Sequence, residues 1–174
     1  MPLFPTDLPE REWCQFNAEG FARPVCGLIH RGTNAPVCGM PLGGIDTGCL
    51  DLEATGVWGY CSIFNSLNPR RGAINEPFLG VSVGRQTWVL STVALSRRDG
   101  QEWIDTMRSW ANYRAAKSAS DIHYWGHFPV ADLEYETDSP LSVGMRAWAP
   151  FMPGDVALTN APAAVFEVHL RNST

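Results

Sequence analysis

Three carboxylates stand at alternate positions in residues 131–137, which read ADLEYET. Asp132, Glu134 and Glu136 would share one face of a strand, where residues two positions apart are about 6.5–7 Å from each other. Two carboxyl groups about 5–10 Å apart can break a glycosidic bond when one of them has a raised pKa. Alternation of acidic and apolar residues is also typical of a sheet with one wet face. We therefore interpret the triplet as solvent-facing and predict no catalytic residue in it.

Four histidines, at positions 30, 123, 127 and 169, are candidate bases or metal ligands. The chain has no G-x-S-x-G, so no particular serine is marked as a nucleophile. His123 and His127 have the i, i+4 spacing that holds zinc on a helix. Gly126 and Pro129 argue against a helix there, and no H-E-x-x-H is present. We predict neither a metal ion nor a cofactor, and we interpret this region as an aromatic cluster.

Residues 39–65, GMPLGGIDTGCLDLEATGVWGYCSIFN, are rich in glycine. Glycine at this density indicates backbone with positive φ or with close neighbours, so we expect residues 41–48 to form a shaped loop, the glycine loop. Its sequence fits neither G-x-G-x-x-G nor G-x-x-x-x-G-K-[ST], which argues against a phosphate site. Its backbone N–H groups and Asp46 could instead line a ligand or a domain interface. The candidate residues are Gly43, Gly44, Asp46 and Thr47.

Composition predicts a packed globular protein. The 174 residues are 45% hydrophobic and 18% charged, which favours a folded core over disorder. The net charge is −5, and no run of basic residues is present, which argues against nucleic acid as a partner. Five cysteines without a C-x-x-C pair predict reduced thiols and hence a cytoplasmic location. No segment has the apolar length of a membrane span or secretory signal.

Short apolar or alternating runs separated by glycine and proline predict strands rather than long helices. The expected strands are residues 26–30, 49–53, 57–64, 78–83, 87–95, 131–137, 141–147 and 164–170. Residues 98–120 mix helical spacing with serine and asparagine, and we expect a short helix or an irregular loop there. The fold class is therefore all-β: an antiparallel β-sandwich with long irregular loops and at most one short helix.

This sandwich is expected to be incomplete. The chain stops at Thr174, just after a predicted strand, and that would leave an exposed strand edge of the kind that proteins normally cover. We expect residues 1–38 to be an irregular N-terminal segment packed on the sandwich. Residues 39–174 would form the sandwich itself, truncated at its C-terminal end. An apolar patch larger than the ~300–600 Å² typical of monomers would mark the missing part.

Several motifs, taken in order along the chain, resemble one family. They are PLGGI (41–45), TG (47–48), Gly56, Trp58, IFN (63–65), MRSW (107–110), HFP (127–129) with Tyr135, APFMPGD (149–155), APAAVF (161–166) and Asn172. Together they resemble the N-terminal domain of glycoside hydrolase family 116, the family of the non-lysosomal glucosylceramidase and its bacterial β-glucosidase relatives. Asp46 stands where the family usually has glycine, which suggests a distinct bacterial-type subgroup.

The resemblance implies a two-domain parent enzyme. In the family, a β-sandwich precedes an (α/α)6 barrel that supplies the glutamate nucleophile and the aspartate acid/base of a retaining mechanism. No catalytic motif of the family has a counterpart in this chain, so we expect the chain alone to be inactive. Its expected role is a scaffold for the barrel, which would act on β-glucosides or glucosylated lipids. The glycine loop, Trp125 and His127 are the expected contacts to the substrate or the barrel.

Two other interpretations stay open. The chain could be a free-standing carbohydrate-binding sandwich that stacks sugar rings on Trp88, Trp125 or Trp148. That interpretation needs an exposed tryptophan, whereas a core position is the more usual one for such a large apolar side chain. The chain could also be a purely structural domain that mediates assembly.

Overall fold

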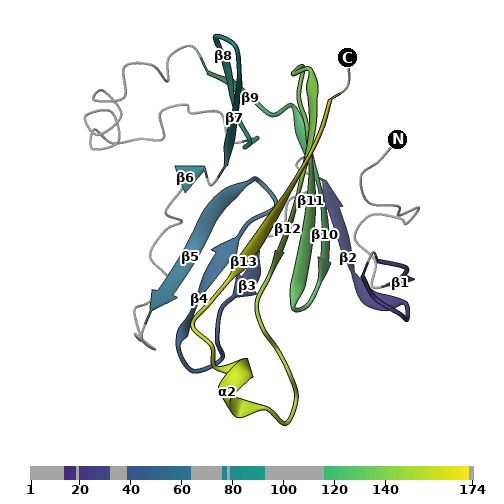
Figure 1. Cartoon of the computed structure of the whole chain (residues 1–174), viewed down its shortest axis with the longest axis vertical. Helices are drawn as coiled ribbons and strands as arrows, with labels where there is room; N and C mark the ends of the chain where they lie inside the picture. The colour runs from purple at the N-terminus through teal and green to yellow at the C-terminus, as the bar shows by residue number, and fades with distance from the viewer. Residues whose placement is uncertain are drawn as a thin grey trace.

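A computed structural model describes residues 14–18, 20–31, 39–63, 76–77, 79–92 and 116–172 of the chain. Within these ranges the protein is built from strands, with one helix of four residues (Figure 1). The predicted all-β class is therefore confirmed. Residues 98–115, where a short helix or loop was expected, lie outside the described ranges, and Lys117–Ser118 at the end of that stretch form a short strand.

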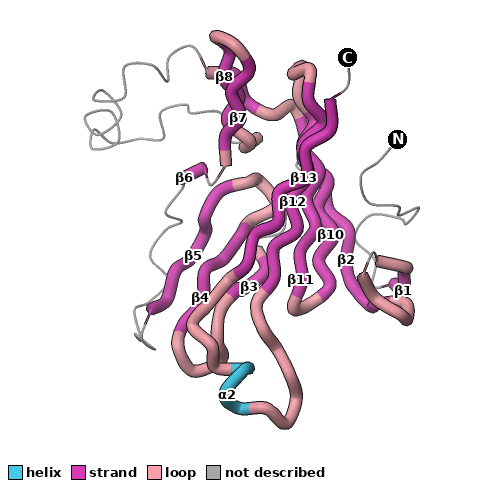
Figure 2. The backbone as a smooth tube through the Cα atoms, in the orientation of Figure 1, coloured by secondary structure: helices cyan, strands magenta, loops and turns pink. Residues whose placement is uncertain are grey.

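The strands, drawn in magenta in Figure 2, form three sheets. The largest sheet has the order β1-β2-β10-β11-β12-β13, and all its neighbouring strands are antiparallel. Its members are β1 (Cys14–Phe16), β2 (Val25–Arg31), β10 (Asp121–His127), β11 (Val130–Glu136), β12 (Leu141–Trp148) and β13 (Val165–Asn172). The second sheet contains β3 (Met40–Leu42), β4 (Gly48–Leu52), β5 (Val57–Ile63) and β6 (Glu76–Pro77). The third contains β7 (Gly80–Val83), β8 (Gln86–Val89) and β9 (Lys117–Ser118).

One apolar core joins residues from all three sheets. Its largest fully buried members include Leu42 and Leu52 from the second sheet, Leu133 and Met145 from the first, and Trp88 from the third. Burying a side chain of this size stabilises the fold by about 1.5–3 kcal/mol. The alternation predicted for residues 131–137 and 141–147 therefore places one face of β11 and β12 in this core.

The hydroxyl of Tyr124 ties the first sheet to the second. It accepts a hydrogen bond from the backbone N–H of Met40 (3.0 Å) and donates one to the carbonyl of Leu52 (3.2 Å). Tyr124 is 3% exposed, so these two bonds satisfy groups that water does not reach. They fix the strands on both sides of the glycine loop against the centre of β10.

The third sheet is attached through Trp88. Its indole lies in the core, and its Nε1 donates a hydrogen bond to Asp138 (2.6 Å) in the turn after β11. Lys117 also donates to Asp138. These hydrogen bonds, first that from Lys117 and then that from Trp88, hold the pKa of the Asp138 carboxyl below its usual value. The bonds connect β8, β9 and the β11–β12 turn.

Most predicted strands are present, with shifts of one or two residues at their ends. The exception among them is 87–95, because β8 ends at Val89. Six elements were not predicted as they occur: the strands β1, β3, β6, β9 and β10 and the helix α2 (Val156–Thr159). With four residues, α2 is far shorter than a bilayer crossing needs, and no described helix meets that requirement.

Candidate functional site

The outer face of the six-stranded sheet, turned away from the core, is rich in polar side chains. Side chains alternate along a strand, and paired residues of neighbouring strands share a face. The register pairs Asp121 with Glu136, His123 with Glu134, Trp125 with Asp132 and, on the next strand, Asp132 with Arg146. The acidic triplet of β11 therefore lies on one face with two histidines of β10.

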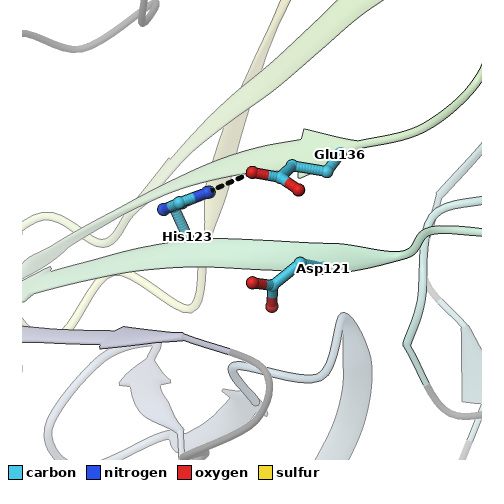
Figure 3. A group of neighbouring side chains, drawn as sticks. All are labelled: Asp121, His123 and Glu136. Carbon is cyan, nitrogen blue, oxygen red and sulfur yellow. Dashed lines mark hydrogen bonds and ion pairs between the residues drawn. The ribbon is translucent and has the colours of Figure 1, made fainter.

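The three carboxylates of the triplet have different environments. Glu136 is exposed and its Oε1 lies 2.7 Å from Nε2 of His123 (Figure 3). Glu134 is half-buried, and Asp132 is only 3% exposed. The prediction that the triplet faces solvent is therefore wrong for Asp132, because the N-terminal segment folds over this end of the sheet.

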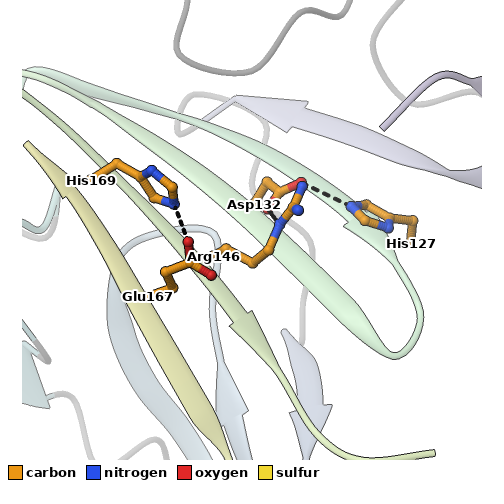
Figure 4. A network of polar contacts seen from close by, with 5 residues as sticks. All are labelled: His127, Asp132, Arg146, Glu167 and His169. Carbon is orange, nitrogen blue, oxygen red and sulfur yellow. Dashed lines mark hydrogen bonds and ion pairs between the residues drawn. The ribbon is translucent and has the colours of Figure 1, made fainter. Parts of the chain in front are cut away.

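Asp132 is the centre of a buried polar network (Figure 4). Arg146 donates to both of its carboxylate oxygens, from Nε (2.7 Å) and from Nη2 (2.9 Å). Nε2 of His127 lies 3.0 Å from Oδ2 of the same carboxylate. The side chains of His127, Asp132 and Arg146 are 1%, 4% and 14% exposed. A two-pronged arginine–carboxylate contact of this kind is both strong and geometrically specific.

The network keeps Asp132 ionised. Burial acts to raise the pKa of this carboxyl, but the hydrogen bonds from Arg146 and His127 outweigh burial, so the pKa lies below its usual value. An acid with a lowered pKa does not donate a proton near neutral pH. Asp132 therefore serves as a fixed negative charge that orients His127 and Arg146, rather than as a general acid.

Aromatic side chains of the N-terminal segment cover this network. Phe16 and Phe21 meet the His127 ring edge-on, with ring centroids 5.5 and 5.4 Å away. Phe16 also packs with Ile29 and Trp125 in a small apolar cluster on the outer face. Nδ1 of His127 is buried and has no hydrogen-bond partner among the described atoms. Trp125 and His127 are thus enclosed by protein in this chain.

The glycine loop is shorter than predicted, because β3 ends at Leu42 and β4 begins at Gly48. Gly43 has φ +146°, and a Cβ added to it would lie 2.3 Å from the carbonyl oxygen of Gly48. A Cβ on Gly44 would meet Thr47 and the backbone of Asn160 at 2.6–2.7 Å. The predicted need for glycine is therefore present at both positions, for two different reasons.

The glycine loop is bonded to the end of α2. The N–H of Ile45 donates to the carbonyl of Thr159 (3.3 Å). Asp46 exchanges two hydrogen bonds with Asn160: its N–H donates to Oδ1, and Nδ2 of Asn160 donates to its carboxylate, both at 3.3 Å. Asn160 is the C-cap of α2, whose N-cap is Asp155. The Asp46 carboxylate therefore has a hydrogen-bond partner in Asn160. A glycine at this position has no side chain and could not form that bond.

Large apolar side chains are exposed around this junction, and we call this surface the apolar end. The helix α2, which is part of it, lies at the lower end of the molecule in Figure 1. The exposed members of the apolar end are Ile45, Phe128, Phe151, Met152, Val156 and Leu158. Ile45 is 61% exposed and Val156 is 73% exposed. Phe128 and Phe151 touch edge-on at 5.2 Å between centroids, and Thr159 bonds the backbone of Met152. Clustered exposed apolar side chains mark surfaces that bind a partner.

The predicted contact residues fall into two groups. Gly43, Gly44, Asp46 and Thr47 lie together in the glycine loop, where Thr47 bonds back to the carbonyl of Gly44. Trp125 and His127 lie on the outer face of β10, under the N-terminal segment. Their role as contacts to a substrate or a barrel stays a prediction.

The tryptophans proposed as sugar platforms are mostly enclosed. Trp88 is 1% exposed and Trp125 is 5% exposed, while Trp148 is half-buried. A stacking platform needs an open ring face, so Trp88 and Trp125 do not meet the requirement in this fold. The contact between Arg146 and Asp132 was not predicted from the sequence. It could be found only from the register of β11 and β12, which places these two residues opposite each other.

The chain matches a protein-family model. The model described as "beta-glucosidase 2, glycosyl-hydrolase family 116 N-term" matches residues 39–174, which include the glycine loop, β10–β13 and the apolar end. Searches of curated proteins and of solved structures gave no match. The matched range is most of the chain and agrees with the motifs of the sequence. The chain therefore belongs to the N-terminal domain family of glycoside hydrolase family 116.

Proposed function

We propose that this chain is the non-catalytic β-sandwich portion of a retaining glycoside hydrolase that acts on β-glucosides. The observation that carries the proposal is the family match over residues 39–174. The glutamate nucleophile and the aspartate acid/base would come from an (α/α)6 barrel of the same parent protein. The substrate would be a β-glucoside or a glucosylated lipid, as in the β-glucosidases and glucosylceramidases of the family.

The carboxylates of the outer face support a non-catalytic role. A retaining glycosidase needs one carboxyl with a raised pKa and a second, ionised carboxylate about 5–5.5 Å away. Asp132 has a lowered pKa and is buried, with Arg146 and His127 bonded to its carboxylate. Glu136 is exposed and bonded to His123. Neither group has the environment of a glycosidase acid.

The apolar end is the proposed contact with the barrel. Its exposed side chains surround the glycine loop, and that loop is held in shape by Gly43, by Gly44 and by the bonds to Asn160. A loop fixed in this way presents Ile45 with a smaller loss of backbone entropy on binding than a flexible loop would have. The scaffold role would thus be to place this rigid loop against the mouth of the barrel.

We also propose a cytoplasmic location. Cys26, Cys49 and Cys61 are free thiols. Burial, more than any other effect, raises the pKa of Cys49 and of Cys61, so both stay protonated and unreactive near neutral pH. Free thiols are typical of proteins in a reducing compartment.

Incubation of the chain with a chromogenic β-glucoside is expected to give no turnover above the uncatalysed rate, because the catalytic carboxylates lie elsewhere. Release of the chromophore, measured by absorbance, checks this. Turnover that disappears in Asp132→Asn or Glu136→Gln variants would overturn the proposal, since it would place the catalytic groups in this domain.

The barrel contact is tested by Ile45→Asp in the full-length parent enzyme. A charge placed in a buried contact lowers affinity by about tenfold or more, so glucoside turnover should fall and the two domains should separate more easily. Turnover and the protease sensitivity of the link between the domains are the measurements. Ile45 is 61% exposed in this domain, so the substitution should leave its own folding intact.

Leu170→Asp is the matched control for that experiment. Leu170 is an apolar residue of similar exposure, 59%, but it lies near the C-terminal end of β13. That end of the strand is at the opposite end of the molecule from α2 (Figure 1). We expect turnover of this variant to stay within about twofold of the parent, as for most surface substitutions. Equal losses in the two variants would contradict a contact centred on the apolar end.

A further inference from the structure

A second group of side chains on the outer face has no part in the proposed function. Asp121 and His123 of β10 and Glu136 of β11 each offer one ligand atom, and these atoms all lie within 4.8 Å of one another (Figure 3). Ligand atoms around one metal ion with bonds of about 2.0–2.2 Å are separated by no more than about 4.4 Å. Around a four-coordinate ion the ligand atoms are roughly 3.3–3.6 Å apart, so side-chain rotations that move these atoms by about 1 Å would bring the three around one ion.

The charges of the group favour a cation. Asp121 and Glu136 are directly opposite each other in the β10–β11 register, and like charges at such positions destabilise a sheet. His123 lies next to this pair, with Nε2 2.7 Å from Oε1 of Glu136. A metal ion between the three side chains would offset the repulsion. The metal ion would replace the hydrogen atom in the bond between His123 and Glu136. The imidazole would then carry its proton on Nδ1.

The donor set indicates which kind of ion fits. One imidazole nitrogen with carboxylate oxygens suits zinc and its neighbours among the divalent transition metals. Magnesium and calcium prefer a shell of oxygen atoms only. Three protein ligands leave room for at least one water molecule on the ion, since Glu136 is largely open to solvent.

The ligands stand on rigid supports. β10 and β11 are paired over seven consecutive residue pairs, which fixes the spacing of all three Cα atoms. The His123 ring lies nearly parallel to Trp125, at 20° and 6.0 Å between centroids. Trp125 is itself held in the cluster with Phe16 and Ile29. Backbone positions held in this way reduce the freedom that the site loses when the metal binds.

We propose that Asp121, His123 and Glu136 form a surface site for a divalent transition-metal ion, with zinc the best-fitting species. The ion would link β10 to β11 at the end of this strand pair opposite the buried Asp132 network. Its function would be structural, because the site contains no group of the proposed glucoside chemistry. This proposal replaces the sequence-based prediction that the chain holds no metal ion.

Titration of the metal-free, untagged protein with Zn²⁺ by calorimetry, and with Co²⁺ by visible absorption, tests the proposal. We expect one equivalent to bind and the melting temperature to rise with metal concentration. The Co²⁺ spectrum should lack thiolate charge-transfer bands, which separates this site from the free cysteines. Mg²⁺ and Ca²⁺ should give no comparable shift.

Two variants and a matched control make the assignment specific. His123→Gln and Glu136→Gln should each weaken binding at least tenfold, with an unchanged circular dichroism spectrum as the test of folding. His169→Gln should bind as the parent does, because His169 pairs with Glu167 at 3.2 Å on β13 but, among the residues that the structure describes, belongs to no group of three ligands (Figure 4). Binding that survives in both site variants, or that is lost equally in the control, would overturn the proposal.

Discussion

Replacing Arg146 by methionine is expected to lower the free energy of unfolding by about 3–5 kcal/mol. The substitution keeps much of the side-chain volume but leaves the Asp132 carboxylate buried without its two-pronged partner. Urea unfolding followed by circular dichroism measures the change. Arg171→Met is the control, because Arg171 is an exposed arginine on the same sheet, and its loss should cost less than about 1 kcal/mol.

A double variant separates the loss of a charge pair from the loss of packing. Asp132→Leu combined with Arg146→Met removes both charges, and an apolar replacement of a buried ion pair is often neutral or stabilising. We therefore expect the double variant to regain most of the stability that Arg146→Met loses. A double variant as unstable as the single one would contradict the view that the uncompensated carboxylate causes the loss.

The pH dependence of the Arg146→Met effect follows from the lowered pKa of Asp132. A carboxyl with a lowered folded-state pKa contributes stability above its unfolded pKa of about 3.9, and that stability is lost as the pH falls through the folded-state pKa. Above pH ~5 the parent therefore has the full benefit of the ionised Asp132. The stability difference between parent and variant should be largest near neutral pH and should shrink as the pH falls below about 4.

Gly43→Ala is expected to destabilise the protein by about 2–4 kcal/mol, through positive φ and a steric clash together. At φ +146° a non-glycine residue is strained, and the new Cβ would meet the carbonyl oxygen of Gly48 at 2.3 Å. That oxygen belongs to the backbone, so it cannot rotate away as a side chain would. The shift required in the loop would also disturb the bond between Ile45 and Thr159.

Gly84→Ala provides the comparison. Gly84 also has a positive φ, +61°, but an added Cβ would meet nothing within 4 Å. Its substitution should therefore cost only the left-handed backbone strain, about 1 kcal/mol. Thermal unfolding of both variants is the measurement. The difference between their losses of stability gives the cost of the steric clash at Gly43. Equal melting temperatures would show that the approach to Gly48 does not constrain the loop.

The strands that could be predicted from sequence are those whose apolar residues face one shared core. Alternation located β11, β12 and β13 because every second residue of β11 and β12 enters the core, and β13 pairs with β12 and packs Phe166 against that core. It did not locate β10, since Trp125 lies on the outer face and is buried there by the N-terminal segment. The helix α2 has no buried residue, so it has no apolar stripe by which to predict it.

The glycine loop and the Asp132 network differ in how far local sequence could reveal them. Glycine density reports a backbone constraint within a few residues, and it correctly marked Gly43. The environment of Asp132 depends on Phe16, Phe21 and Arg146, which lie far away or on another strand. A pattern of seven residues cannot show that a distant segment covers it. The sequence pattern of a buried ion pair was therefore the same as that of a solvent-exposed strand face.

The link between Asp46 and Asn160 also has a consequence for the order of folding. It joins residues 114 positions apart, whereas β10, β11 and β12 follow one another through short turns. Closing a longer stretch of chain loses more entropy, and contacts between distant residues form more slowly. We expect β10, β11 and β12 to assemble early and the glycine loop to settle only after α2 has docked. The surface proposed to receive the partner would then appear last, on a molecule that is otherwise folded.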